Sequence, residues 1–383
     1  MLSSWTASWN RWLAAGAIAG GVSYALGQSK TLLVFRHAAT ELLRGGDLYV
    51  HWLDFFKYSP TFALLFLPLA WLPPWLAAAL WGVLNFGVAF AGIDAVTPDP
   101  QKKRTVLVVA LAGVLLATDG DQSNLLVAGL MLLAFAALEK KRIVLFAVLV
   151  AIATHVKLFP IAAVLFAFLH PRPLRTLAWL GGALVVTTLA PLLVVSPSTL
   201  AMEYASWARL LGVDHMHRGW SIMTMLEDGL GIRPSKEFIQ ALGVGILAVP
   251  ILASRAPTDA ALRRIFAASV LVFCVLFNHR AEYASFVVSA IGVGIWFAEE
   301  PPTPLRRVLL GLAIVAHGPL FALPEPTATG AVFGFLAAHR VFHPLRILPL
   351  AAVWGLMLFD LLHARILVPL LAESRVSRPS LGG

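Results

Sequence analysis

The chain has 383 residues, of which 59% are hydrophobic and only 13% are charged, and its mean hydropathy is +0.82. Because soluble domains are about half apolar and roughly a quarter charged, this composition excludes an ordinary water-soluble fold. The net charge of +9 could indicate nucleic-acid binding, but the basic residues stand in short clusters between apolar runs. We therefore expect a protein of the lipid bilayer with no nucleic-acid partner.

Long apolar runs follow one another from residue 12 to residue 371. They measure about 14 to 23 residues, and a helix needs roughly 20 to cross a bilayer, so the sequence predicts about 11 to 13 membrane helices. Lipid does not tolerate unpaired backbone groups, and the runs lack the alternation of barrel strands. The predicted fold is an all-α polytopic transmembrane helical bundle, with one membrane domain over residues 1–372 and a polar tail over 373–383.

The basic clusters between the runs predict the orientation, because Lys and Arg are enriched in cytoplasmic loops. The clusters expected on the cytoplasmic side are Lys102, Lys103 and Arg104; Lys140, Lys141 and Arg142; Arg172 and Arg175; Arg255, Arg263 and Arg264; and Arg306 and Arg307. The N-terminus is then also cytoplasmic, and residues 12–28 form a retained first span. The outward loops are residues 29–59, 118–124, 155–159, 196–236 and 278–283, and a turn near Pro324.

The first outward loop begins with an amphipathic pattern. At the helical period, the apolar side chains between positions 32 and 43 fall on one side and the charged ones on the other. This pattern predicts a helix lying in the membrane interface, which Gly45 and Gly46 end. Residues 60–72 are too short to cross, so we expect a re-entrant or broken half-helix there.

Five polar clusters map to the outward side, where ionisable residues at membrane depth are candidates for function. In the first, Asp54 or Asp47 could act as a general base, Lys57 could bind a phosphate, and Tyr58 could contact substrate. The alternative is a solvated loop with interfacial aromatic residues. In the second, Asp121, Gln122 and Asn124 suit sugar hydroxyls or a helix N-cap equally well.

The third and fourth clusters combine histidines with cations. Lys157, beside His155, could hold an anionic lipid head group or simply extend its ammonium to the interface. In the loop over residues 214–221, two histidines do not form a recognisable metal site, so Arg218 and Ser221 are predicted to belong to a lid that touches substrate.

The fifth cluster contains His279, Arg280 and Glu282. Arg280 could bind a phosphate through two hydrogen bonds, or it could pair with Glu282 and do nothing more. No zinc spacing, Walker loop or Ser-His-Asp set occurs in the chain, so we predict no metal ligands, and no motif supports a divalent metal or another cofactor.

Several motifs resemble those of the family 87 glycosyltransferases, which belong to the GT-C superfamily. The matching stretches are residues 35–39, 45–49, 57–66, 120–124, 157–160 and 279–283, with Pro68 and Trp81. The resemblance implies a GT-C bundle that transfers a hexose, typically mannose, from a polyprenyl-phosphate donor to a lipid or glycan acceptor. The reaction is expected to be inverting and to occur on the outer face of the plasma membrane.

The resemblance also suggests roles for the polar clusters, with one departure. Asp54, or else Asp47, would be catalytic; Lys57, Lys157, Arg280 and His279 would bind the donor phosphate; and the remaining cluster residues would bind substrate. The GT-C pattern has its catalytic aspartate just before the amphipathic helix, but residues 30–33 contain no carboxylate. Either Asp54 or Asp47 takes the role, or transferase chemistry is lost.

Two other functions therefore stay open: a transporter or flippase of an isoprenoid-linked anion, and a non-catalytic relative that binds lipid-linked sugar. A transporter would require ionisable residues across the bilayer and an internal repeat with broken helices. The polar residues instead concentrate at one face, and no repeat is evident, so we favour the enzyme. That hypothesis requires Asp54, Lys157 and Arg280 to share one pocket.

Overall fold

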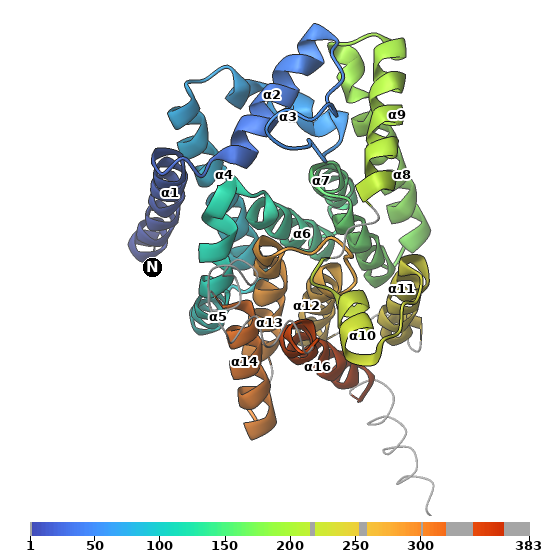
Figure 1. The fold of residues 1–383 in the computed structure, drawn as a ribbon. Coiled ribbons are helices and arrows are strands. Elements are labelled where there is room, and N and C mark those ends of the chain that lie inside the picture. Colours follow the sequence, from blue (N-terminus) through green and yellow to red (C-terminus); the bar gives the residue numbers. More distant parts are fainter. Residues whose placement is uncertain (1, 215–218, 253–258, 300–301, 319–339, 364–383) are drawn as a thin grey trace, which may run out of the picture.

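The computed structural model describes residues 2–214, 219–252, 259–299, 302–318 and 340–363, and these residues form a helical bundle that contains no β-strand (Figure 1). This arrangement confirms the predicted all-α membrane bundle. The helices are α1 (Leu2–Ala25), α2 (Lys30–Arg44), α3 (Pro60–Ala70), α4 (Pro74–Val96), α5 (Pro100–Thr118), η1 (Asp119–Asp121), α6 (Asn124–Glu139), α7 (Ile143–Val156), η2 (Phe159–Leu169), α8 (Pro173–Leu189), η3 (Ala190–Leu193), α9 (Pro197–Asp214), α10 (Ile222–Leu230), α11 (Lys236–Leu252), α12 (Ala260–Leu276), η4 (Tyr283–Ser285), α13 (Phe286–Glu299), α14 (Pro304–His317) and α16 (Phe342–Leu362).

Three continuous helices in the described part of the chain are long and apolar enough to cross a bilayer: Pro74–Val96, Pro173–Leu193 and Phe342–Leu362. The described part of the chain also has shorter apolar helices, α6, α7, η2 and α13 among them. The total number of crossings stays a prediction, and the turn expected near Pro324 lies outside the described residues.

Helix α1 packs closely on α4 through glycines. A Cβ atom at Gly82 would overlap the backbone of Gly16, and one at Gly20 would overlap the backbone of Ala78. Small residues of this kind let membrane helices approach each other closely. The α1–α4 pair therefore depends on the absence of side chains at these positions.

The amphipathic helix occurs as predicted in α2. Its apolar face, which includes Leu32, Phe35 and Leu42, is buried, although Leu43 is exposed. Gly45 ends the helix with a φ of 72°, a left-handed conformation that glycine adopts without strain. Arg36, which the sequence pattern places on the polar side, donates hydrogen bonds to the carbonyl oxygens of Leu69 and Leu72, at 2.9 and 2.7 Å.

The short helix α3 is the predicted half-helix. It has 11 residues, and at about 1.5 Å per residue it is too short to cross a core of roughly 30 Å. Ser59 caps it by accepting a hydrogen bond from the N–H of Phe62. Arg36 satisfies carbonyl groups at its other end, so α2 and α3 form one unit at this side of the bundle.

Residues of two predicted cytoplasmic clusters meet at one end of the bundle. Glu299, at the end of α13, accepts hydrogen bonds from Lys102 at 2.6 Å and from Arg264 at 2.7 Å. Arg263 bonds to Glu139 and to the carbonyl oxygen of Leu169. These contacts join the ends of α5, α6, η2, α12 and α13, which makes one end of the bundle a network of ion pairs.

Candidate active site

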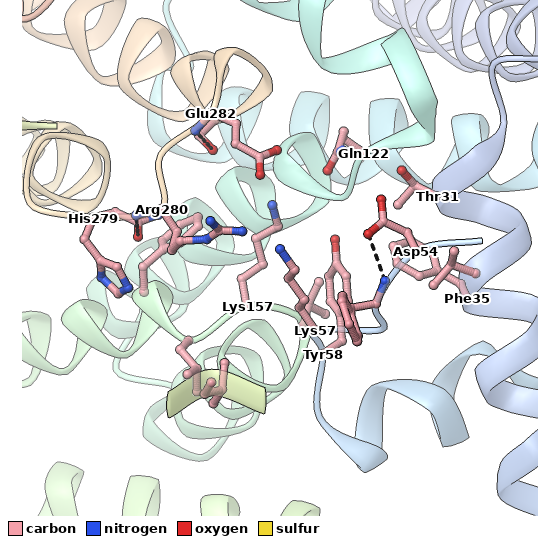
Figure 2. A pocket seen from close by; sticks show the side chains of 18 of the residues that line it. Thr31, Phe35, Asp54, Lys57, Tyr58, Gln122, Lys157, His279, Arg280 and Glu282 are labelled. Atoms are coloured by element: carbon pink, nitrogen blue, oxygen red, sulfur yellow. Dashed lines mark hydrogen bonds between the residues drawn. The ribbon is translucent and has the colours of Figure 1, made fainter. Parts of the chain in front are cut away.

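The loops at the other end of the bundle enclose a cavity of about 430 Å³ (Figure 2). Four polar segments, those before α3, after η1, after α7 and before η4, contribute side chains to its wall. The sequence-predicted residues that line it are Asp54, Lys57, Tyr58, Gln122, Lys157, His279, Arg280 and Glu282. Residues more than 200 positions apart in the chain thus face one space, as the enzyme hypothesis requires.

The segment with Lys57 and Tyr58 is fixed from two directions. The hydroxyl of Tyr49 donates to the carbonyl oxygen of Tyr58 at 2.9 Å, and the indole N–H of Trp207 donates to that of Lys57 at 3.2 Å. Phe35 packs edge-on against the Tyr58 ring, with 4.7 Å between the centroids. The backbone of this segment is therefore positioned by α2 and α9.

Asp54 lies at the α2 side of the cavity, beside Thr31 (Figure 2). Its carboxylate is 3.0 Å from the ammonium of Lys30 and accepts a hydrogen bond from the N–H of Phe55 at 2.8 Å. Partial burial alone would raise the pKa of Asp54, but Lys30, the Phe55 N–H and Lys57 outweigh it and hold that pKa below its ordinary value. The side chain is half exposed, so it is ionised and accessible.

Lys157 brings a cation into the middle of the cavity. It follows the last residue of α7, and its ammonium donates to the side-chain oxygen of Asn124 at 2.9 Å. Desolvation lowers the pKa of Lys157 to about 8, while Glu282 opposes the shift and Lys57 adds to it. In Figure 2 the ammonium groups of Lys57 and Lys157 lie between Asp54 and Arg280. An anion in this space would meet several cations.

The segment with His279, Arg280 and Glu282 forms the opposite wall. Glu282 and Ser285 form a capping box at the start of η4, which fixes the direction of the chain at this point. His279 also lines a smaller cavity of about 130 Å³ on the α10 side, together with Ser221. The predicted substrate residue Ser221 therefore lies behind the main cavity, and its hydroxyl points to the sulfur of Met223 at 3.3 Å.

Other predicted site residues occupy different positions. Asp47 accepts hydrogen bonds from Ser206 on α9 and from the N–H of Tyr49, and it is not part of the cavity wall. Asp121 is buried, has a φ of 56°, and lies beside Trp81, whose indole donates to its carbonyl oxygen. Asn124 reaches the cavity through its bond to Lys157. Arg218 lies outside the described residues.

His155 joins helices and does not line the cavity. One ring nitrogen lies 3.1 Å from the hydroxyl of Ser59 and the other lies 2.9 Å from that of Thr187. The Ser59 hydroxyl also donates to the carbonyl oxygen of His155. This arrangement ties α3, α7 and α8 together, which is a structural use of a histidine that the sequence pattern could not distinguish from substrate binding.

Sequence reasoning missed several residues of the wall, namely Lys30, Thr31, Phe35, Phe159 and Ser285. In the sequence, position 30 stands out only because residues 30–33 lack a carboxylate. The pairing of Lys30 with Asp54 depends on the fold of the loop between α2 and α3, which no local pattern predicts.

A second, mostly apolar cavity of about 870 Å³ lies between α1, α4 and α5. Ile18, Val22 and Leu115 are among its lining residues, and Gln28 and Thr118 stand at one end. That end adjoins the Asp54 cavity, because a Cβ at Gly120 would lie 3.6 Å from the hydroxyl oxygen of Thr31 and 3.8 Å from the carbonyl oxygen of Gln28. A polar cavity and an apolar groove are thus neighbours.

The sequence predicts no metal ligands in this chain. Among the described residues, no group of three or more His, Cys, Asp or Glu side chains is arranged to hold a metal ion. The cavity wall instead combines lysine and arginine with two carboxylates, Asp54 and Glu282.

These features define a membrane-embedded helical bundle with a cation-lined cavity at one end. A comparison with protein families matches residues 55–278, more than half of the chain, to glycosyltransferase family 87. The chain belongs to this family. The match confirms the family that the motifs indicated.

A comparison with curated proteins finds a shorter likeness. A stretch of 66 residues is 35% identical to the protein HupE of Rhizobium leguminosarum bv. viciae. It covers 16% of this chain and 35% of HupE. The match spans about a third of that relative, so it shows a local similarity and carries no argument about function.

Proposed function

We propose that the protein transfers a hexose, with mannose as the sugar we favour, from a polyprenyl-phosphate donor to a lipid or glycan acceptor. The proposed site is the cavity of Asp54, Lys157 and Arg280, and the proposed location is the outer face of the plasma membrane. The observation that carries the proposal is a carboxylate facing several cations across one cavity. This combination suits a reaction that needs a base and releases a phosphate.

In the proposed reaction, the acceptor hydroxyl gives its proton to the Asp54 carboxylate as its oxygen attacks the anomeric carbon. The bond between that carbon and the phosphate oxygen breaks, and the polyprenyl phosphate leaves with the bonding electrons. Attack opposite the leaving group inverts the anomeric configuration. Help from a general base is worth about 10² to 10⁴ in rate.

The leaving phosphate carries the negative charge that develops during the reaction. Lys57, Lys157 and Arg280 line the cavity together, and fixed cations aimed at a developing charge are a large source of catalysis. Arg280 offers a planar fork of donors, whereas each lysine acts as a point charge. We assign His279 to the same phosphate group, because it lies next to Arg280 in the wall.

The apolar groove between α1, α4 and α5 fits the donor's isoprenoid chain. A polyprenyl phosphate needs a polar place for its head group and an adjoining apolar path for its tail. The groove end at Gln28 and Thr118 adjoins the cavity at Thr31. We assign the tail to this groove.

The position of Asp54 is relevant to the carboxylate that residues 30–33 lack. Asp54 comes from a later loop, yet its carboxylate pairs with Lys30 and lies beside Thr31, at the start of α2. In the GT-C pattern that the motifs resemble, the aspartate belongs just before this helix. A carboxylate supplied from position 54 favours a catalytic protein over a sugar-binding relative without activity.

The test is a mass-spectrometric assay of the purified full chain. The protein is incubated with a panel of polyprenyl-phosphate sugars and membrane-lipid acceptors, and we expect an acceptor whose mass rises by one hexose. An unchanged acceptor with tight donor binding would support the non-catalytic alternative. Movement of the intact lipid-linked sugar between leaflets of a vesicle, without transfer, would support the transporter alternative.

A further inference from the structure

A buried arginine lies behind the cavity wall and has no role in the proposed reaction. Arg346, in the second turn of α16, has no exposed surface. Its guanidinium carbon lies 3.5 Å from the centre of the Trp220 ring and 5.0 Å from that of Phe286. Burying a cation is costly unless specific contacts compensate. Those two rings provide cation–π contacts, which are strongest when the cation is desolvated.

Trp220 connects this arginine to the candidate active site. The backbone N–H of Trp220 donates to the carbonyl oxygen of Ala281 at 2.7 Å, and that of Gly219 donates to the carbonyl oxygen of His279 at 2.6 Å. The two hydrogen bonds bracket Arg280, whose side chain lines the cavity. The Arg280 segment is therefore held through the backbone of residues 219 and 220.

The backbone contact at Gly219 is too close to accommodate a side chain. A Cβ there would lie 2.6 Å from backbone atoms of Ala281 and 2.7 Å from the carbonyl oxygen of His279. Any side chain at position 219 would push the two segments apart. The fit makes the position of the Arg280 segment sensitive to the position of Trp220.

The Trp220 ring is fixed on its other sides as well. It packs against Phe286 and Tyr283, with ring centroids 6.1 and 6.2 Å away. At the first turn of α16, His343 lies 2.6 Å from the carboxylate of Asp228 on α10. Helix α16 thus approaches the cavity wall through α10 and through Arg346, although no side chain of α16 lines the cavity.

We propose that Arg346 is a positioning residue, which holds Trp220 and thereby keeps the His279–Arg280 segment in place to bind the phosphate of the lipid-linked donor. The phosphate part of this inference rests on the proposed function. The positioning part does not, because it concerns hydrogen bonds within the chain.

The experiment therefore uses two readouts. Hydrogen exchange of the peptides over residues 219–224 and 278–285, in the protein without substrate, reports how firmly the backbone of residues 219 and 220 is bonded to that of residues 279 and 281. Binding of polyprenyl phosphate, the released product, reports the site. The variants are Arg346→Met, which removes the cation but fills similar space, and Arg346→Lys, which keeps a cation.

In Arg346→Met we expect exchange of the Gly219 and Trp220 amides to accelerate about tenfold or more, the scale of a lost desolvated cation–π contact. The dissociation constant for polyprenyl phosphate should rise by a similar factor, and Arg346→Lys should restore part of both. The donor KM should rise more than kcat falls, because Arg346 itself does not touch the reacting atoms. If Arg346→Met does not fold, Trp220→Leu, which keeps the cation and removes the ring, should give the same two changes.

A matched control is Arg306→Met. Arg306 also lies over a tryptophan ring, 5.7 Å from the centre of Trp296, and pairs with Asp360. None of these three residues lines the cavity. This variant should leave exchange at residues 278–285 and product binding unchanged. Wild-type exchange in Arg346→Met would overturn the positioning role. If exchange is faster in Arg346→Met but the wild-type protein does not bind polyprenyl phosphate, the positioning role stands and only the proposed function is overturned.

Discussion

The carboxylate of Asp54 lies 3.0 Å from the ammonium of Lys30, which brings together the residue proposed as base and the position where the resembled pattern has its aspartate. The pair connects the start of α2 with the loop before α3. It places the proposed base at the edge of a cavity whose other wall carries Lys157 and Arg280.

Asp54→Asn should abolish transfer while leaving expression intact. The amide cannot accept the acceptor's proton, so kcat should fall by about 10² to 10⁴, as measured by the rate of acceptor mass change. Asp47→Asn is the matched control, because Asp47 bonds to Ser206 away from the cavity, and it should retain kcat within about tenfold. Full activity in Asp54→Asn would remove the base assignment, and a collapse confined to Asp47→Asn would transfer the role to Asp47.

Lys30→Met should shift the acid side of the pH–rate profile upward. The proposed reaction needs ionised Asp54, and Lys30 helps to hold the pKa of Asp54 below its ordinary value. Without that cation the carboxyl protonates at a higher pH, so the variant should lose activity earlier than the wild type as pH falls. Lys30→Arg keeps the charge and should keep the wild-type profile. Identical acid limbs in all three proteins would contradict the pairing.

Binding of the donor should weaken as pH rises through about 8, the pKa to which desolvation lowers Lys157. Above that value the free protein loses one of the cations proposed to hold the phosphate. The measurement is the donor KM as a function of pH. Lys157→Arg stays charged at these pH values, so its KM should not rise over the same interval. A flat wild-type profile would mean that Lys157 does not bind the phosphate.

The stability of the protein should fall as pH rises from 4.5 to about 7, the interval over which Glu203 titrates differently in the folded and unfolded chains. Burial raises the pKa of Glu203 from 4.5 to about 7, the N–H of Leu48 opposes this shift, and Asp47 adds to it. In that interval the unfolded chain is ionised while the folded one stays neutral, so folding loses on the order of 1 to 3 kcal/mol. Thermal unfolding at several pH values should show this slope in the wild type and a smaller one in Glu203→Gln. Equal slopes would show that Glu203 ionises in the folded protein as it does in the unfolded chain.

His155→Ala should reduce stability and leave the donor KM unchanged. The substitution removes the hydrogen bonds of the ring to Ser59 and Thr187, and an intramolecular hydrogen bond contributes about 0.5 to 1.5 kcal/mol to stability. Unfolding temperature and KM are measured on the same preparation. A raised KM at normal stability would return His155 to the substrate-binding residues.

The sequence was sufficient for the class of fold and for much of the cavity wall. Helical period and glycine position predicted α2, and the short apolar stretch over residues 60–72 predicted a half-helix, which the structure has as α3, Pro60–Ala70. Ionisable residues at the ends of apolar runs led to Asp54, Lys57, Lys157 and Arg280, because charges survive at such depths only beside a polar space.

Other features depend on contacts between distant segments. Nothing near Lys30 in the sequence indicates that it pairs with Asp54, and nothing near Arg346 shows that it packs on Trp220. Asp47, like Asp54, has aromatic neighbours in the sequence. In the structure, however, Asp47 accepts a hydrogen bond from Ser206 on α9. Local pattern cannot separate such residues, because their roles depend on which helix happens to face them.

The ion-pair network around Glu299 lies at the end of the bundle opposite the loops that bear the proposed chemistry. Mutations in those loops do not alter the residues that form the Lys102 and Arg264 contacts, so we expect the scaffold to tolerate changes at the end that holds the cavity. Engineered chimeras that exchange these loops with those of a relative should therefore keep the helices of this bundle.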